Sequence, residues 1–168
     1  MNLDIEIRHA VKEDLKALTV IYNHYVVETP FTFDLEPKSI EERTEWLSHY
    51  STTGPYQLFV AIKEGRLIGY ASSSKFREKK AYETSVETTI YLEPNSQHKG
   101  TGSLLYDALF KAIDSMDIHR AYAGITQPNA ASVALHEKCG FISVGLYKEV
   151  GRKFGRFWDV QWFEKPLK

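Results

Sequence analysis

A glycine-bearing turn between an apolar strand and an amphipathic helix constrains this chain more than any other stretch. The turn reads QHKGTG over residues 97–102 and separates an expected strand at 84–92 from an expected helix at 100–116. Because glycine has no Cβ, Gly100 and Gly102 let the chain turn tightly and bring several backbone N–H groups to one anion. The positive end of the helix dipole and the charge of Lys99 add to that attraction. The turn therefore predicts a phosphate-binding loop.

Two familiar phosphate loops do not fit this turn. A Walker-type loop places Lys-Ser or Lys-Thr directly after its last glycine, whereas here Lys99 precedes Gly100 and Ser103 follows Gly102. A dinucleotide fingerprint would place its third glycine where Leu105 stands. The sequence thus disfavours an NTPase and a dinucleotide-binding domain. A glycine-rich helix start that binds no ligand remains the simpler alternative.

Composition limits the class of protein. The 168 residues are 43% hydrophobic, which suits one domain over residues 1–168 with one sizeable core. The net charge of −1 makes nucleic acid an unlikely partner. No apolar run approaches the roughly 20 residues of a membrane span, and the N-terminus is acidic, so we expect a cytoplasmic protein without a membrane partner.

Cysteine and aromatic residues add two expectations. The single Cys139 excludes an internal disulfide and is interpreted as a small packed side chain. Aromatic residues make up 13% of the chain, with 10 Tyr and 9 Phe, more than a core of this size usually needs. Some of them are therefore expected to line a pocket or a subunit interface.

Hydrophobic periodicity predicts eleven elements in the order βααβββαβαββ, which is an α/β (α+β) fold. Ser39 and Glu42 form a capping box that opens the second helix, and Gly140 closes the last one. Residues 149–156 are expected to form a glycine-bearing loop late in the chain. The expected strands are 5–7, 57–63, 67–74, 84–92, 120–125, 141–148 and 157–163, and the expected helices are 12–27, 39–50, 100–116 and 130–138.

The element order, the glycine loop and the run NAASVALHEKCGF at 129–141 together resemble the GNAT superfamily of N-acetyltransferases. Shorter motifs at 21–23, 33–37, 76–77, 82, 86–87 and 149–156 resemble its phosphinothricin and methionine sulfoximine N-acetyltransferase group. The resemblance implies a GNAT fold, with a mixed, mostly antiparallel central sheet flanked by helices. It also implies a homodimer that transfers an acetyl group from acetyl-CoA to the α-amine of a small amino-acid analogue.

Glu87 is the candidate general base. An ammonium group must lose a proton before its nitrogen attacks a thioester, and Glu87 lies in the expected central strand just before the loop. A solvated strand glutamate is the alternative that the residue alone leaves open. Because side chains alternate along a strand, Thr89 should share the side of Glu87, while Thr88 and Ile90 face the other way.

The resemblance also implies contacts with acetyl-CoA. Backbone groups of Ile90, Tyr91 and Leu92 would bind the pantetheine arm and polarise the thioester carbonyl. Asn129 would bind pantetheine as well, although an ordinary helix cap explains it equally. The implied cofactor-binding residues of the loop and the last helix are Gln97, His98, Lys99, Gly100, Thr101, Gly102, Ser103 and Ser132.

His136 stands where many members of the superfamily carry a tyrosine that protonates the departing CoA thiolate. An imidazole could do the same, and a histidine packed in the helix and satisfied by hydrogen bonds is the alternative. The remaining histidines show no ligand spacing with Asp, Glu or Cys, so we expect no metal site.

The acceptor site is implied less directly. Arg77 would bind the acceptor carboxylate, because a guanidinium pairs with a carboxylate through two hydrogen bonds, although it could be a plain surface arginine. Phe33 and Tyr82 would form pocket walls, Thr88 and Thr89 would contact the acceptor, and residues 153–156 could reach a partner subunit's site. We expect direct transfer in a ternary complex. Another acceptor amine (an amino acid, a polyamine or a protein N-terminus) and a non-catalytic acyl-CoA sensor remain alternatives, and the physiological acceptor stays open.

Overall fold

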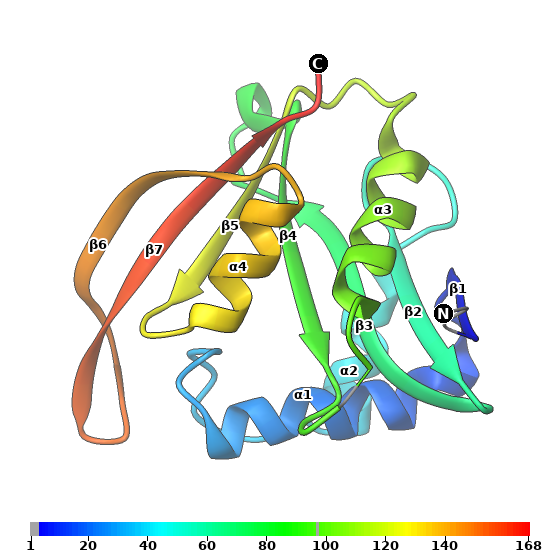
Figure 1. The fold of residues 1–168 in the computed structure, drawn as a ribbon, viewed down its shortest axis with the longest axis horizontal. Coiled ribbons are helices and arrows are strands. Elements are labelled where there is room, and N and C mark those ends of the chain that lie inside the picture. Colours follow the sequence, from blue (N-terminus) through cyan, green and yellow to red (C-terminus); the bar gives the residue numbers. More distant parts are fainter. Residues whose placement is uncertain (1–3, 97) are drawn as a thin grey trace.

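The computed structural model describes residues 4–96 and 98–168, which form a seven-stranded sheet with helices on both faces (Figure 1). The strand order is β1-β2-β3-β4-β5-β7-β6, and every neighbouring pair is antiparallel except β4 and β5. The predicted element order and the mixed, mostly antiparallel sheet are confirmed. The strands are β1 (Ile5–His9), β2 (Leu58–Lys63), β3 (Arg66–Lys75), β4 (Ser85–Leu92), β5 (Arg120–Thr126), β6 (Ile142–Lys153) and β7 (Arg156–Pro166).

The four helices begin and end where local signals place them, to within a few residues. They are α1 (Leu15–Glu28), α2 (Ile40–Ser48), α3 (Thr101–Ile113) and α4 (Ala130–Lys138). In the capping box of α2, the Glu42 N–H donates to Ser39 Oγ at 3.1 Å and the Ser39 N–H donates to Glu42 Oε2 at 2.8 Å. Gly140, just after α4, has the left-handed φ of 87° that suits glycine. No helix in the described part of the chain is long and apolar enough to cross a membrane.

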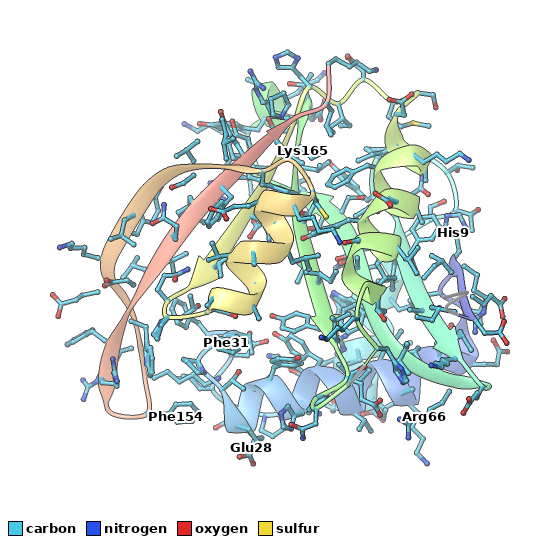
Figure 2. All side chains as sticks on the ribbon, in the orientation of Figure 1. His9, Glu28, Phe31, Arg66, Phe154 and Lys165 are labelled. Carbon is cyan, nitrogen blue, oxygen red and sulfur yellow. The ribbon has the colours of Figure 1, made fainter. Side chains whose placement is uncertain are left out.

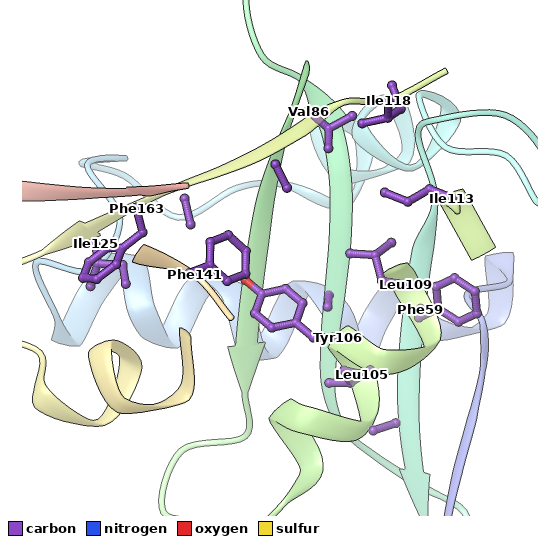
Figure 3. Close-up of a cluster of buried hydrophobic side chains, with 14 of the residues drawn as sticks. Phe59, Val86, Leu105, Tyr106, Leu109, Ile113, Ile118, Ile125, Phe141 and Phe163 are labelled. Atoms are coloured by element: carbon purple, nitrogen blue, oxygen red, sulfur yellow. The ribbon is translucent and has the colours of Figure 1, made fainter. Parts of the chain in front are cut away.

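Alternation along β2 divides the core between the two faces of the sheet. Phe59 and Ala61 pack on the α3 face, and Leu58 and Val60 pack on the α1 face. Figure 3 shows the α3 side, where Leu105, Tyr106, Leu109 and Ile113 lie along one face of the helix and point at the sheet. The helix spacing of these four positions is the reason that α3 buries one stripe.

The sheet opens between its two central strands. β4 and β5 pair only from Ser85–Arg120 to Glu87–Tyr122, whereas β4 continues to pair with β3 as far as Leu92. Because each strand stays bonded to its outer neighbour, the two strands can diverge without leaving the sheet. The divergence begins at Glu87.

The prediction of a loop at residues 149–156 is wrong. β6 and β7 continue through this stretch as a long hairpin that turns at Phe154 and Gly155, the tip labelled Phe154 in Figure 2. The pairing accommodates Gly151 through a register shift between Tyr147 and Gly151. Gly151 also lets the hairpin meet the segment after α1, because a Cβ there would clash with the ring of Phe33.

Candidate active site

A cavity of about 940 Å³ lies where β4 and β5 diverge, and we call it the β4–β5 cavity. It extends between the first turn of α3, α4 and the β6–β7 hairpin, elements that surround the open centre of the ribbon in Figure 1. Most of the side chains singled out in the sequence border it. These are Phe33, Glu87, Thr88, Thr89, Ile90, Tyr91, Leu92, His98, Lys99, Gly100, Gly102, Ser103, Asn129, Ser132 and His136.

One end of the cavity is the N-terminus of α3. Gly100 caps the helix with a left-handed φ of 92°, and a Cβ on Gly102 would lie 2.7 Å from Leu135 Cδ2. The glycines therefore permit both the turn and the close approach of α4. Unpaired N–H groups of a first helical turn and the charge of Lys99 suit this end to a phosphate. Gln97 lies outside the described residues.

Thr101 belongs to the loop but does not border the cavity. Its side chain is buried, and its Oγ1 donates a hydrogen bond to the His98 carbonyl at 2.8 Å. His98 Nδ1 in turn lies 3.1 Å from Lys63 Nζ on β2. Thr101 therefore shapes the loop from inside rather than facing a ligand.

Glu87 borders the cavity at the point where the strands separate. It is partly buried between Ser74 of β3 and Tyr122 of β5, its register partners. Burial raises the pKa of the Glu87 carboxyl above its usual value, and the positive charge of Arg77 opposes that rise. A carboxyl with a raised pKa is a better proton acceptor than an exposed one.

Asn129 and Ser132 place α4 at the cavity wall. The Ser132 N–H donates to the side-chain oxygen of Asn129 at 3.2 Å. Asn129 is therefore the N-cap of α4, which agrees with the interpretation of this residue as an ordinary helix cap. Both residues also border the cavity.

His136 is buried, and both of its ring nitrogens make hydrogen bonds. Nδ1 lies 2.7 Å from the Ser132 carbonyl, which can only accept, so Nδ1 carries the proton. Nε2, 2.8 Å from the Tyr106 hydroxyl, then accepts from it. Burial lowers the pKa of His136, which also favours the neutral ring. In this arrangement the imidazole fixes Tyr106 of α3 against α4, and an acid role would first require protonation of Nε2.

The acceptor residues divide into two groups. Thr88 is buried under α3, with its Oγ1 3.4 Å from the Tyr106 hydroxyl, whereas Thr89 and Phe33 face cavity space. Arg77 and Tyr82 are exposed and do not border the cavity, and the Arg77 guanidinium lies 4.2 Å from the ring centroid of Phe76. The structure therefore brings Phe33 and Thr89 to Glu87's cavity but leaves Arg77 at its outside.

Lys153 does not reach outward from the hairpin. Its side chain is buried, and Nζ donates to the Thr32 carbonyl of the same chain at 2.8 Å. The contact ties the hairpin to the segment that follows α1.

Sequence reasoning missed the wall formed by β5, β6 and β7. Trp162 and Tyr147 border the cavity, and Gly124 leaves the room that Trp162 occupies, since a Cβ there would lie 3.1 Å from the indole. The indole Nε1 of Trp162 is buried without a hydrogen-bond partner. No local pattern identifies these residues, because they meet through the pairing of β7 with β5 and with β6.

Within residues 4–96 and 98–168, no group of three His, Cys, Asp or Glu side chains could hold a metal ion. The cavity offers a partly buried carboxylate, open strand backbone and a helix N-terminus that suits phosphate.

The chain belongs to the acetyltransferase (GNAT) domain family, whose sequence model matches residues 7–162. It is an N-acetyltransferase of this family. The phosphinothricin N-acetyltransferase of Streptomyces coelicolor is 56% identical over 166 residues, which cover 98% of this chain and 97% of that one.

Two further relatives carry related names. The L-methionine sulfoximine/L-methionine sulfone acetyltransferase of Salmonella typhimurium is 34% identical over 96% of this chain and 94% of its own length. The crystal structure of a phosphinothricin acetyltransferase from Sinorhizobium meliloti, in complex with acetyl-CoA, superposes with a TM-score of 0.92 at 35% identity. That comparison covers 98% of this chain and 89% of the other.

The burial of neutral His136 predicts a pH-dependent stability. Its folded pKa is lowered, so the unfolded chain takes up this proton first as the pH falls. The contribution of His136 is complete above the unfolded pKa of about 6.5 and is lost as the pH falls from there through the lower folded pKa. Urea unfolding between pH 8 and pH 5 should show a smaller loss of unfolding free energy in His136→Gln than in the wild type. Equal losses in the two proteins would contradict this assignment.

Proposed function

We propose that this enzyme acetylates the α-amine of a small amino-acid analogue of the phosphinothricin or methionine sulfoximine type, with acetyl-CoA as donor. The observation that carries the proposal is the partly buried Glu87 carboxyl at the divergence of β4 and β5. The names of the Streptomyces and Salmonella relatives support this class of acceptor. We also propose that transfer is direct, in a ternary complex without a covalent enzyme intermediate.

The reaction follows from the order of groups along β4. Glu87 takes a proton from the acceptor ammonium, and the free amine attacks the thioester carbonyl. Backbone N–H groups of the segment Ile90, Tyr91 and Leu92 stabilise the developing oxyanion, because β5 no longer pairs with this part of β4. The tetrahedral intermediate then collapses to the amide, and the CoA thiolate leaves and takes up a proton. A proton from His136 remains a prediction of the resemblance.

Acetyl-CoA binding is supported by the helix N-terminus at Gly100 and by the ligand of the Sinorhizobium structure. In the proposed complex the pyrophosphate lies against the first turn of α3, and the pantetheine arm follows the open edge of β4 toward Glu87. Asn129 and Ser132 form the opposite wall. We propose no metal in this reaction.

The acceptor carboxylate is proposed to bind near Arg77. The positive charge of Arg77 acts on the pKa of Glu87, so the two groups share one electrostatic environment although Arg77 lies outside the cavity. Phe33 and Thr89 would contact the acceptor from the cavity side, and Tyr82 would cover it from outside. Two functions compete with this proposal. The enzyme could acetylate another amine, or the protein could bind acyl-CoA as a sensor without turnover.

Thiol release from acetyl-CoA tests the function and the base together. The acceptors to compare are phosphinothricin, methionine sulfoximine, methionine sulfone, common amino acids, a polyamine and a peptide. We expect rapid release with the first three. Glu87→Gln should lower kcat by roughly two to four orders of magnitude through loss of a general base. The wild-type rate should also fall as the pH drops through the raised pKa of Glu87.

Glu83→Gln is the matched control, because Glu83 is exposed and does not border the cavity. It should keep the wild-type rate. Release with the polyamine or the peptide alone would reject the proposed acceptor class. Full activity of Glu87→Gln would remove Glu87 from the mechanism, and binding of acetyl-CoA without turnover of any acceptor would favour the sensor.

The phosphate loop gives a separate prediction. Gly100→Val should weaken acetyl-CoA binding, because a side chain blocks the close approach of pyrophosphate to the backbone. Gly54→Val is the control: Gly54 has a similar left-handed φ of 83°, but nothing lies within 4 Å of its Cβ position. Calorimetric titration with acetyl-CoA should show a larger Kd for Gly100→Val than for the wild type, and an unchanged Kd for Gly54→Val. Equal affinities in the two variants would reject the loop assignment.

We also propose a homodimer that associates through β6. This strand lies at the edge of the sheet, and Ile142, Val144 and Val150 are 55%, 48% and 55% exposed. An exposed apolar edge strand is a ready surface for pairing with a second chain. Sedimentation should show a dimer that Val144→Glu dissociates, whereas Val20→Glu on the exposed face of α1 leaves it intact. A monomeric wild type would reject the proposal.

Two further predictions from the sequence also remain untested. One is the single-domain organisation of residues 1–168, and the other is a cytoplasmic location.

A further inference from the structure

A second cavity, of about 910 Å³, lies between α2 and the strands β3 and β4, and we call it the α2 cavity. Its walls are mainly aromatic and include Tyr22, Trp46, Tyr50 and Tyr70. Tyr70 packs with Leu18 and Ile21 of α1 on the face of the sheet away from α3. The acetyl-transfer reaction proposed above uses none of these four side chains.

Arg43 borders this cavity and is only 4% exposed. Its guanidinium carbon lies 3.5 Å from the ring centroid of Trp46 and 4.5 Å from that of Tyr22. Its Nη2 donates to the Tyr70 hydroxyl over a long 3.5 Å, and its Nε is buried without a hydrogen-bond partner. In the part of the chain that the structure describes, no carboxylate forms an ion pair with Arg43.

Asp14, another buried ionisable group, has a charged partner. Arg8 donates to both carboxylate oxygens of the buried Asp14, at 2.7 and 2.9 Å. Such two-point pairing is the usual arrangement for a buried charge. Cation–π contacts offset part of the desolvation cost of Arg43. They occupy the faces of the guanidinium, however, and leave the N–H groups at its edge without a carboxylate acceptor among the described residues.

We propose that the α2 cavity binds a small carboxylate of the apolar amino-acid class, with the carboxylate paired to Arg43. The planar guanidinium fork fits a carboxylate through two parallel hydrogen bonds. The aromatic walls take the apolar side chain, and the ammonium group faces Glu42 and Glu45, which border the same cavity. Each part of the ligand thereby meets a complementary group.

The Arg43 end of the α2 cavity is separate from Glu87, although the cavity extends along the same face of the sheet as far as Ser74. Tyr70, which contacts Arg43, is the register partner of Tyr91, whereas Ser74 is the register partner of Glu87. The four residue steps from Glu87 to Tyr91 span about 13 Å along a strand. An α-amine and its carboxylate are attached to the same carbon, so an amino acid bound at Arg43 cannot present its amine to Glu87. The two cavities share only Thr89 and Tyr91 as lining residues.

The indole N–H signals of the three tryptophans test the proposal in the wild-type protein saturated with CoA, which permits no turnover. Trp46 borders the α2 cavity and Trp162 borders the β4–β5 cavity, so each reports on one site. The probes are L-phenylalanine, 3-phenylpropionate, which lacks the amine, and 2-phenylethylamine, which lacks the carboxylate. The signals are assigned with Trp46→Phe and Trp162→Phe.

We expect the two carboxylates to shift the Trp46 signal to saturation and to leave Trp162 unchanged, with no response to 2-phenylethylamine. Arg43→Lys keeps the charge but loses the fork, and should weaken 3-phenylpropionate binding by about tenfold or more. Unchanged CoA affinity in this variant shows that it is folded. Three results would each overturn the proposal in the wild type. 2-Phenylethylamine could bind as tightly as the carboxylates, the Trp162 signal could shift at the same ligand concentration as the Trp46 signal, or the Trp46 signal could respond to neither carboxylate. These outcomes are independent of the acetyl-transfer assay.

Discussion

The loss of pairing between β4 and β5 after Glu87 is the constraint on which the site depends. β4 stays bonded to β3 as far as Leu92, and β5 stays bonded to β7 along its whole length. Each strand therefore keeps one set of backbone hydrogen bonds while its other edge faces the β4–β5 cavity. A strand edge without a partner strand offers backbone donors and acceptors to a ligand, and the carboxyl of Glu87 stands at the point where that edge begins.

Helices α3 and α4 are held together by a small network of hydrogen bonds inside an apolar core. Tyr106 of α3 donates to His136 of α4 at 2.8 Å, and His136 donates to the backbone of its own helix. Figure 3 shows Tyr106 among Leu105, Phe141 and other core side chains. A buried polar group costs free energy unless it is hydrogen-bonded, and here both partners are satisfied. The network fixes the wall formed by α4 relative to the phosphate end formed by α3.

Two ionisable groups of this protein have opposite surroundings. Glu87, at the divergence of β4 and β5, combines partial burial with an opening to a cavity, and burial raises its pKa. On the α2 face, Arg43 is enclosed by aromatic rings and has no carboxylate partner among the described residues. The first arrangement suits proton transfer, and the second suits an anionic ligand.

The sequence by itself determined the features that depend on neighbours along the chain. The bounds of α4 follow from the Asn129 cap and from Gly140, and the turn before α3 follows from Gly100. The repeating apolar patterns predicted the element order, and the motifs at 97–102 and 129–141 carried the family resemblance. Alternation along β4 separated Thr88 from Thr89. These predictions succeed because each signal acts within a few residues.

Only the tertiary structure decided which distant residues meet. The wall at Trp162, the enclosure of Arg43 and the exposed position of Arg77 depend on strand order and helix packing, which no local pattern encodes. The end of the β6–β7 hairpin, at residues 149–156, was mistaken for a loop because its glycines resemble a turn. In the fold, a register shift accommodates Gly151, and its missing Cβ makes room for Phe33, a residue more than a hundred positions earlier in the chain.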